Sequence, residues 1–149
     1  MVNIMVPDYP LASDAYYDGQ ISDAYTVKAA KLKGKLVHIS TVSLTVDLWT
    51  SRANDAYLGI MLYYILADGL LCARLLDCVE LPADQRAAKN IANTMKARFE
   101  YWGIVDKVIV VISDNGQNMV NALEYHLKIK YVIGCFAHST TLASTRLSR

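Results

Sequence analysis

Two aspartates stand at the ends of apolar segments that we interpret as buried strands. Asp47 lies near the end of residues 42–49, and Asp114 directly follows residues 108–113. Carboxylates at adjacent strand ends can hold two Mg²⁺ or Mn²⁺ ions about 3.5–4 Å apart. Such ions prefer oxygen ligands and promote phosphodiester chemistry, and a third acid usually completes the set. The pattern therefore raises the hypothesis of a divalent-metal site.

Each aspartate also has a purely structural interpretation. Asp114 precedes Gln117 by three residues, which is the spacing of a capping box at the start of a helix. Asp47 could cap the turn that follows its own strand. The spacing alone leaves these alternatives open.

Cys135 and His138 have the spacing of half a zinc site. Structural zinc needs four ligands, and no second Cys/His pair follows. A buried thiol and a histidine at a helix start are therefore the favoured interpretation. A Cys-His nucleophilic pair is less favoured still, because nothing near His138 in the sequence would orient it.

The other histidines and the two tryptophans favour structural roles. His38 and His126 are isolated in the sequence, as expected for surface or satisfied core residues. We expect Trp49 and Trp102 to be core anchors rather than platforms for base stacking.

The composition limits the class of protein. A length of 149 residues and a hydrophobic content of 54% suit one globular domain. No apolar run reaches the roughly 18 residues of a membrane span, and we see no secretory signal. Three cysteines without a framework spacing favour reduced, intracellular thiols. The net charge of +1 argues against a tight stand-alone DNA binder, because such proteins usually carry a strong basic excess. Lysines do gather at Lys28, Lys31, Lys33 and Lys35, but they suit a solvated helix end about as well.

Hydrophobic patterning predicts three strands in a meander. They cover residues 42–49, 56–67 and 70–81, and Asp68-Gly69 between the last two is a strong hairpin signal. Residues 1–20 are expected to form a loop and residues 21–36 a helix.

The second half alternates helices and strands. We predict a helix from an N-cap at Asp84 to residue 102 with Gly103 as C-cap, a strand at 108–113, a helix at 115–128 and a strand at 131–136. The order β-β-β-α-β-α-β indicates an α/β mixed sheet with helices on its faces. If the fourth strand lies parallel to the first, Asp47 and Asp114 end on neighbouring strands, roughly 4.8 Å apart.

Four segments in register resemble the hAT superfamily of transposases, especially the branch with BED-type zinc fingers. They are VSLTVDLWTSRANDAYLGI (42–60), NIANTMKARFEYWGIVDKV (90–108), SDNGQNMVNAL (113–123) and IGCFAHSTTLA (133–143). The order and spacing of the segments match from about residue 10 to the C-terminus, which makes the resemblance specific.

The resemblance implies an RNase H-like fold and assigns roles to the candidate residues. Asp47 matches the first acid of the family's Asp-Asp-Glu triad and Asp114 the second, with Mg²⁺ or Mn²⁺ as cofactor. Trp49 belongs to the D-x-W-T-S motif, and Cys135 and His138 match a C-x-x-H motif near the active site. DNA as partner, a nuclear location, homo-oligomer formation in full-length relatives and no membrane contact are also implied.

The chain departs from the family pattern at several points. We expect residues 1–40 to be a loop and helical lead-in and residues 41–149 a partial RNase H-like domain, cut before the family's helical insertion and catalytic Glu. No residue matches that third acid, and the BED finger is missing from the sequence. Arg86 and Ala87 stand where the family often has His-Thr, and Thr140-Thr141-Leu142 replaces Leu-Asn-Leu.

The expected function is that of a partial transposase catalytic domain. Its ancestral reaction is divalent-metal-dependent DNA cleavage and strand transfer, and we expect this chain alone to be inactive. The alternative is a domesticated, non-catalytic DNA- or protein-interaction or regulatory domain. A degraded element without function is a third interpretation of the same sequence.

Overall fold

The computed structural model describes residues 13–82, 86–138 and 140. The chain divides into two compact units, Met1–Lys35 and Leu36–Arg149. No helix in the described ranges is long and apolar enough to cross a membrane.

The first unit consists, in its described part, of the long helix α2 (Asp14–Leu36), whose final residue already belongs to the second unit. The Oγ atom of Ser13 accepts a hydrogen bond from the Tyr16 amide at 3.3 Å and so caps the helix, and Asp14 adds a negative charge in the first turn. The expected helix start at residue 21 was therefore wrong. Composition suggested a loop, but a serine cap followed by an acid begins the helix seven residues earlier. The loop predicted for residues 1–12 lies outside the described residues.

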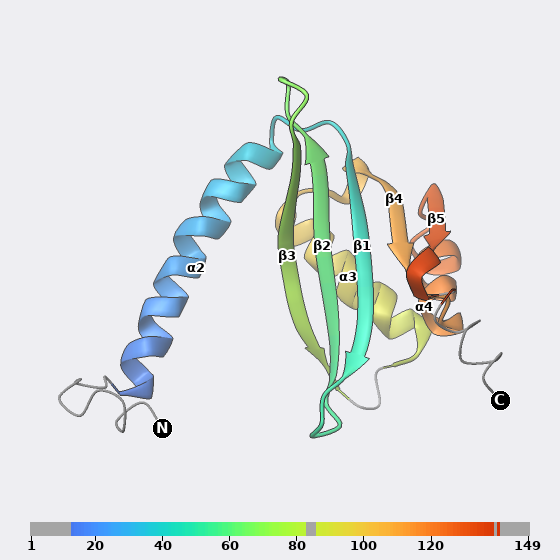
Figure 1. Ribbon diagram of the computed structural model, residues 1–149, viewed down its shortest axis with the longest axis horizontal. Coiled ribbons are helices and arrows are strands. Elements are labelled where there is room, and N and C mark those ends of the chain that lie inside the picture. The colour runs from blue at the N-terminus through green and yellow to red at the C-terminus, as the bar shows by residue number, and fades with distance from the viewer. Residues whose placement is uncertain (1–12, 83–85, 139, 141–149) are drawn as a thin grey trace. The chain divides into compact units, whose positions relative to one another are not determined.

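The second unit is built on a five-stranded sheet with the order β3-β2-β1-β4-β5 (Figure 1). The strands are β1 (Val42–Thr50), β2 (Ala56–Ile65), β3 (Leu71–Leu81), β4 (Val108–Ser113) and β5 (Tyr131–Gly134). β1 pairs antiparallel with β2 and parallel with β4, and β4 pairs parallel with β5. The α/β class with a mixed sheet and the parallel neighbours β1 and β4 are thus confirmed.

The predicted hairpin between β2 and β3 is confirmed. Gly69 adopts a φ of 85°, its amide donates to the Leu66 carbonyl at 2.9 Å, and the Asp68 carboxylate accepts from the Leu70 amide at 3.1 Å. An aspartate followed by a glycine thus satisfies both the polar groups and the left-handed geometry of this turn.

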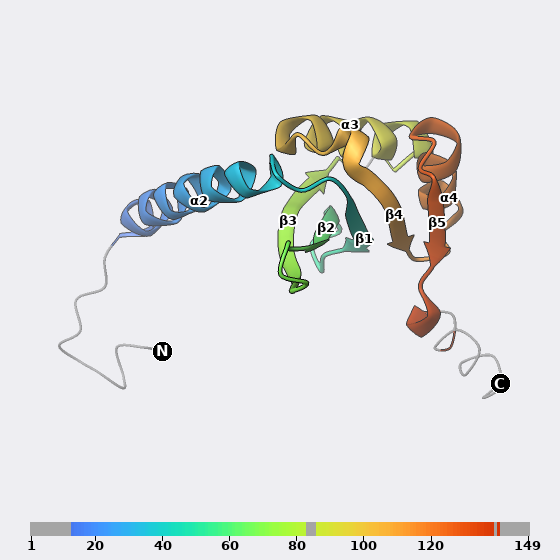
Figure 2. The same ribbon diagram turned by 90° about the horizontal axis from the view of Figure 1, so that it is seen from above.

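Helix α3 (Ala88–Trp102) lies across one face of the sheet, with α4 on the same side (Figure 2). Alternate residues of β1 and β2 are buried, which is the pattern of strands with one face in the core. The helix contributes Ile91, Ala92, Met95, Phe99 and Trp102 to the buried set, so the core interpretation of Trp102 is confirmed.

Helix α3 begins later than its sequence predicts and ends where its sequence predicts. The N-cap is Ala87, which makes no side-chain cap hydrogen bond, so the cap predicted at Asp84 was wrong; residues 83–85 lie outside the described residues. Gly103 is the C-cap, with a φ of 66°, and its amide donates to the Glu100 carbonyl at 3.1 Å.

After β4 the chain forms a shorter helix than expected. α4 (Gln117–Asn121) runs into a π-helical turn (Ala122–His126), in which the Leu127 amide donates to the Ala122 carbonyl at 2.9 Å. The wider turn ends the helix at a Lys128 with a φ of 53°. β5 stops at Gly134 rather than residue 136, and Phe136 is exposed.

Candidate metal centre

Asp47 and Asp114 directly follow the last pair of residues that joins the parallel strands β1 and β4. Val46 of β1 pairs with Ser113 of β4, and both residues are buried. The two aspartates come next along strands that run in the same direction, so their backbones lie on neighbouring strands, roughly 4.8 Å apart. The fold thus brings the two predicted acids together at one edge of the sheet.

Side-chain alternation places Asp47 on the face of the sheet opposite α3. Val46 is buried under the helix, so the next residue points to the other face, and Asp47 is exposed. The turn after β1 is capped by Ser51, whose Oγ accepts hydrogen bonds from the amides of Ala53 and Asp55 at 3.2 and 3.1 Å. The alternative that Asp47 caps this turn was therefore wrong.

Asp114 is held by the loop that leads into α4. Its Oδ1 accepts a hydrogen bond from the Gly116 amide at 3.3 Å, while the N-cap of α4 is Gly116, without a side-chain cap bond. The capping-box alternative was wrong, because α4 begins at Gln117 itself. The tight turn folds the Asp114 carboxylate over Gly116, where an added Cβ would lie 3.2 Å from Oδ1.

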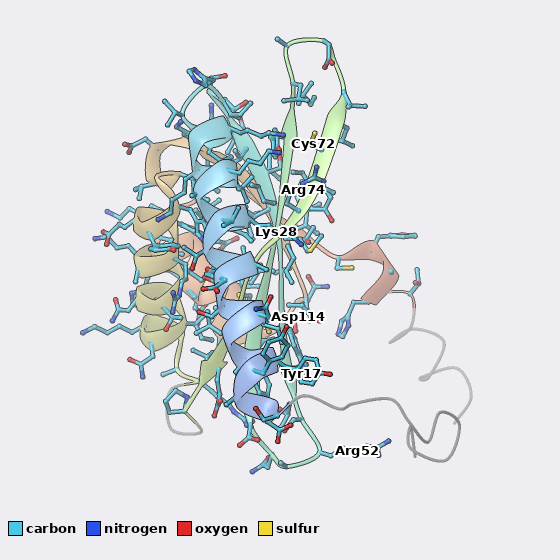
Figure 3. The ribbon with its side chains drawn as sticks, turned by 90° about the vertical axis from the view of Figure 1, so that its left-hand side faces the viewer. Tyr17, Lys28, Arg52, Cys72, Arg74 and Asp114 are labelled. Carbon is cyan, nitrogen blue, oxygen red and sulfur yellow. The ribbon has the colours of Figure 1, made fainter. Side chains whose placement is uncertain are left out.

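An open groove of about 710 Å³ contains both acids. It is lined by residues of β1, β2, β3 and β4 and of the segment after β5, and Figure 3 labels Asp114. The sequence motifs at 47–49 and 135–138 meet in this groove, although they are far apart in the chain. Its lining residues are Thr45, Val46, Asp47, Trp49, Gly59, Met61, Leu75, Ile112, Ser113, Asp114, Cys135, Ala137 and His138.

Trp49 is part of the groove wall and not of the core. It is 42% exposed and stacks on Tyr57, with ring centroids 5.9 Å apart and an interplanar angle of 24°. The core interpretation of Trp49 was thus wrong. The apolar residues around it suggested burial, but its side chain alternates to the face that α3 does not cover. The carboxylate of Glu80, opposite Tyr57 on β3, raises the pKa of the Tyr57 hydroxyl.

Gly59 was missed as a site residue. It pairs with Asp47, and a Cβ at this position would lie 2.8 Å from Cζ3 of Trp49. The missing side chain leaves the space that the indole occupies beside Asp47. A glycine inside a strand pattern indicates such a close approach, so this role of Gly59 could have been inferred from the sequence.

Gly134, at the end of β5, leaves space for a side chain next to Asp114. A Cβ on Gly134 would collide with the side chain of Asn115, the residue after Asp114. The Cys135 amide donates to the Ser113 carbonyl at 2.7 Å and continues the parallel pairing beyond β5. The end of β5 therefore contacts the residues on both sides of Asp114, the backbone of Ser113 and the side chain of Asn115.

Cys135 and His138 lie in the groove, but without a zinc-like cluster. Cys135 is half-buried and not fully buried as expected, and His138 is exposed in a helical turn. Within residues 13–82, 86–138 and 140, no group of three His, Cys, Asp or Glu residues could hold a metal ion. His38 and His126 are exposed, as predicted for surface residues.

Arg86 joins the loops at this edge of the sheet. Its Nη2 donates to the Asn54 carbonyl after β1 at 3.3 Å, and the Asn118 amide side chain in α4 donates to the Arg86 carbonyl at 3.0 Å. Arg86, just before α3, thus links the loop after β1 to the start of α4.

Comparison with known proteins links this chain to a family of RNase-like domains and to transposases. Residues 45–136 match the model of the ZBED1 RNase-like domain. Two curated relatives from Zea mays, described as "Putative AC transposase" and "Putative AC9 transposase", are each 28% identical over 115 residues. The aligned region covers 76% of this chain and 14% of each relative, so the chain spans about one seventh of their length.

Proposed function

Since the chain belongs to the ZBED1 RNase-like domain family, we propose that it is the part of a hAT-type transposase catalytic domain that binds a divalent metal. The resemblance to hAT transposases agrees with the family match and with the two maize relatives. The observation that carries the proposal is the position of Asp47 and Asp114. They follow a paired position on two parallel strands and line one groove.

The side chains of Asp47 and Asp114 are suitable ligands for Mg²⁺ or Mn²⁺. Both ions prefer oxygen ligands, and Asp47 and Asp114 offer carboxylates that are exposed and half-exposed. No described residue donates a hydrogen bond or forms an ion pair with the Asp47 carboxylate, so it is available to a cation. When bound, the metal would activate a water or hydroxyl and stabilise a leaving oxygen.

The protein's own contribution is to hold the two carboxylates in place. Gly116 fixes Asp114 through its amide, and the backbone pairing of β1 with β4 sets the spacing of the two strands. A third acid outside the described residues would complete the ligand set. With two acids alone, the chain should bind metal weakly and should not cleave DNA by itself.

DNA is the proposed substrate of the complete site, in a nuclear protein. The groove lining contains no Lys or Arg, so its described residues do not supply cations for a phosphate backbone. The contacts that hold DNA would therefore come from residues outside this described lining.

The test is the thermal stability of the purified chain with Mn²⁺. A ligand at tenfold its dissociation constant stabilises by about 1.4 kcal/mol, which should raise the melting temperature by about 3–8 °C. Asp47→Asn with Asp114→Asn should abolish this increase. Asp23→Asn with Asp106→Asn removes the same charge elsewhere and should preserve it. If the unchanged protein shows no Mn²⁺ effect, a non-catalytic interaction domain becomes the better account.

A further inference from the structure

The loop between β4 and α4 contains the single Asn-Gly pair of the chain, Asn115-Gly116. Both residues are exposed, and residues 114–116 belong to neither a helix nor a strand. An asparagine side chain can react with the backbone nitrogen of the next residue, and glycine favours this reaction because it has no Cβ to crowd that nitrogen. Sequence and local structure therefore both indicate Asn115 as a position where the chain can modify itself.

The structure places a proton acceptor beside the nitrogen that would attack. The Gly116 amide donates a hydrogen bond to Oδ1 of Asp114 at 3.3 Å. A carboxylate in hydrogen-bond reach of a nucleophile can take its proton during the attack, and such bonds are often long in the resting protein. The Asn115 side chain lies beside Gly134. It must turn towards Gly116 before it reacts, so the reaction is slow enough to be followed over days.

We propose that Asn115 deamidates spontaneously in the folded chain, with Asp114 as the base. The Gly116 nitrogen attacks Cγ of Asn115 and passes its proton to Asp114. Asp114 returns this proton to the side-chain nitrogen of Asn115, which leaves as ammonia, and a five-membered succinimide ring remains. One water molecule then opens the ring to aspartate or to isoaspartate. Ammonia is exchanged for water in total, and no electrons are transferred.

Either product places a new carboxylate directly after Asp114. Asn115 is not among the residues that line the groove, so this carboxylate adds negative charge rather than a metal ligand. A further negative charge near Asp47 and Asp114 strengthens the attraction of a divalent cation to them. This consequence rests on the proposed metal site, whereas the deamidation itself does not.

Mass spectrometry of proteolytic peptides tests the reaction after incubation of the full, folded chain at neutral pH. Asn54 is the comparison within the same sample, because it is also exposed in a loop. It precedes Asp55, which carries a side chain and whose amide donates to Ser51 Oγ at 3.1 Å. We expect Asn115 to be converted about tenfold faster than Asn54. An Asn115 that is converted no faster than Asn54 would overturn the proposal.

Two variants test the role of Asp114. Asp114→Asn keeps the shape of the side chain but removes the base, and should slow the conversion of Asn115 about tenfold. Asp106→Asn makes the same change at an exposed position before β4 and should leave the rate unchanged. Circular dichroism checks that both variants are folded. An unchanged rate in folded Asp114→Asn would show that Asp114 is not the base.

The variant Asn115→Asp carries the aspartate product from the start and tests the consequence for metal binding. It should bind Mn²⁺ about threefold more tightly than the unchanged chain in isothermal titration calorimetry. Asn93→Asp adds the same charge on an exposed position of α3 and should bind Mn²⁺ like the unchanged chain. Equal affinities of all three chains would contradict the effect of the new charge. Absence of Mn²⁺ binding in all three would contradict the proposed metal site instead, while mass spectrometry still decides the deamidation.

Discussion

Replacing Leu44 with alanine is expected to lower the free energy of unfolding by about 3 kcal/mol, within the range for fully buried leucines. Leu44 is 0% exposed on the central strand β1, where it pairs with Leu62 of β2 and Val111 of β4, which are equally buried. The cavity left behind would lie under α3, where strands on both sides prevent collapse. Chemical denaturation of the purified protein measures the loss.

Leu75→Ala is the matched control. It removes the same atoms from β3, but Leu75 is 64% exposed on the face opposite α3. Its stability should change by less than about 0.5 kcal/mol, as for most surface substitutions. Equal losses for the two variants would contradict the assignment of the core to the α3 side of the sheet.

Replacing Gly134 with alanine should affect both stability and metal binding. The new Cβ would occupy the position of the Asn115 side chain, which must then move together with the backbone next to Asp114. Overpacking of this kind costs about 1–3 kcal/mol. Because Asn115 directly follows Asp114, we expect the Mn²⁺-dependent increase in melting temperature to shrink as well.

Gly34→Ala provides the comparison, since a Cβ on Gly34 meets no atom within 4 Å. In a helix, this change should stabilise by about 0.5–1 kcal/mol and leave the response to Mn²⁺ unchanged. Unaltered stability and metal response in Gly134→Ala would show that the end of β5 does not position Asp114.

The strands and the position of the acids were predictable because their signals are local and strong. Two apolar runs that end at Asp47 and Asp114, with a helix between the third and fourth strands, leave few arrangements other than parallel neighbours. The Asp68-Gly69 turn and the Gly103 cap were equally clear, because both positions need the left-handed backbone that glycine adopts at no steric cost.

The errors arose where tertiary packing overrides local preference. Asp114 has the spacing of a helix cap, yet its carboxylate bonds to Gly116 in the preceding loop. Trp49 looks like a core residue in composition, but strand alternation and the space at Gly59 place it in the groove wall. Which face of a strand α3 covers depends on the whole sheet, and a single strand does not reveal it.

Nuclear magnetic resonance with substoichiometric Mn²⁺ tests the metal centre most directly, because the paramagnetic ion broadens the amide signals of nearby residues. We predict broadening centred on Asp47 and Asp114 and extending to Gly116 and Cys135, and its loss in the Asp47→Asn, Asp114→Asn double variant. Broadening centred on Asp14, Asp18 and Asp23 in the first half of α2, or unchanged broadening in the double variant, would contradict a metal site at Asp47 and Asp114.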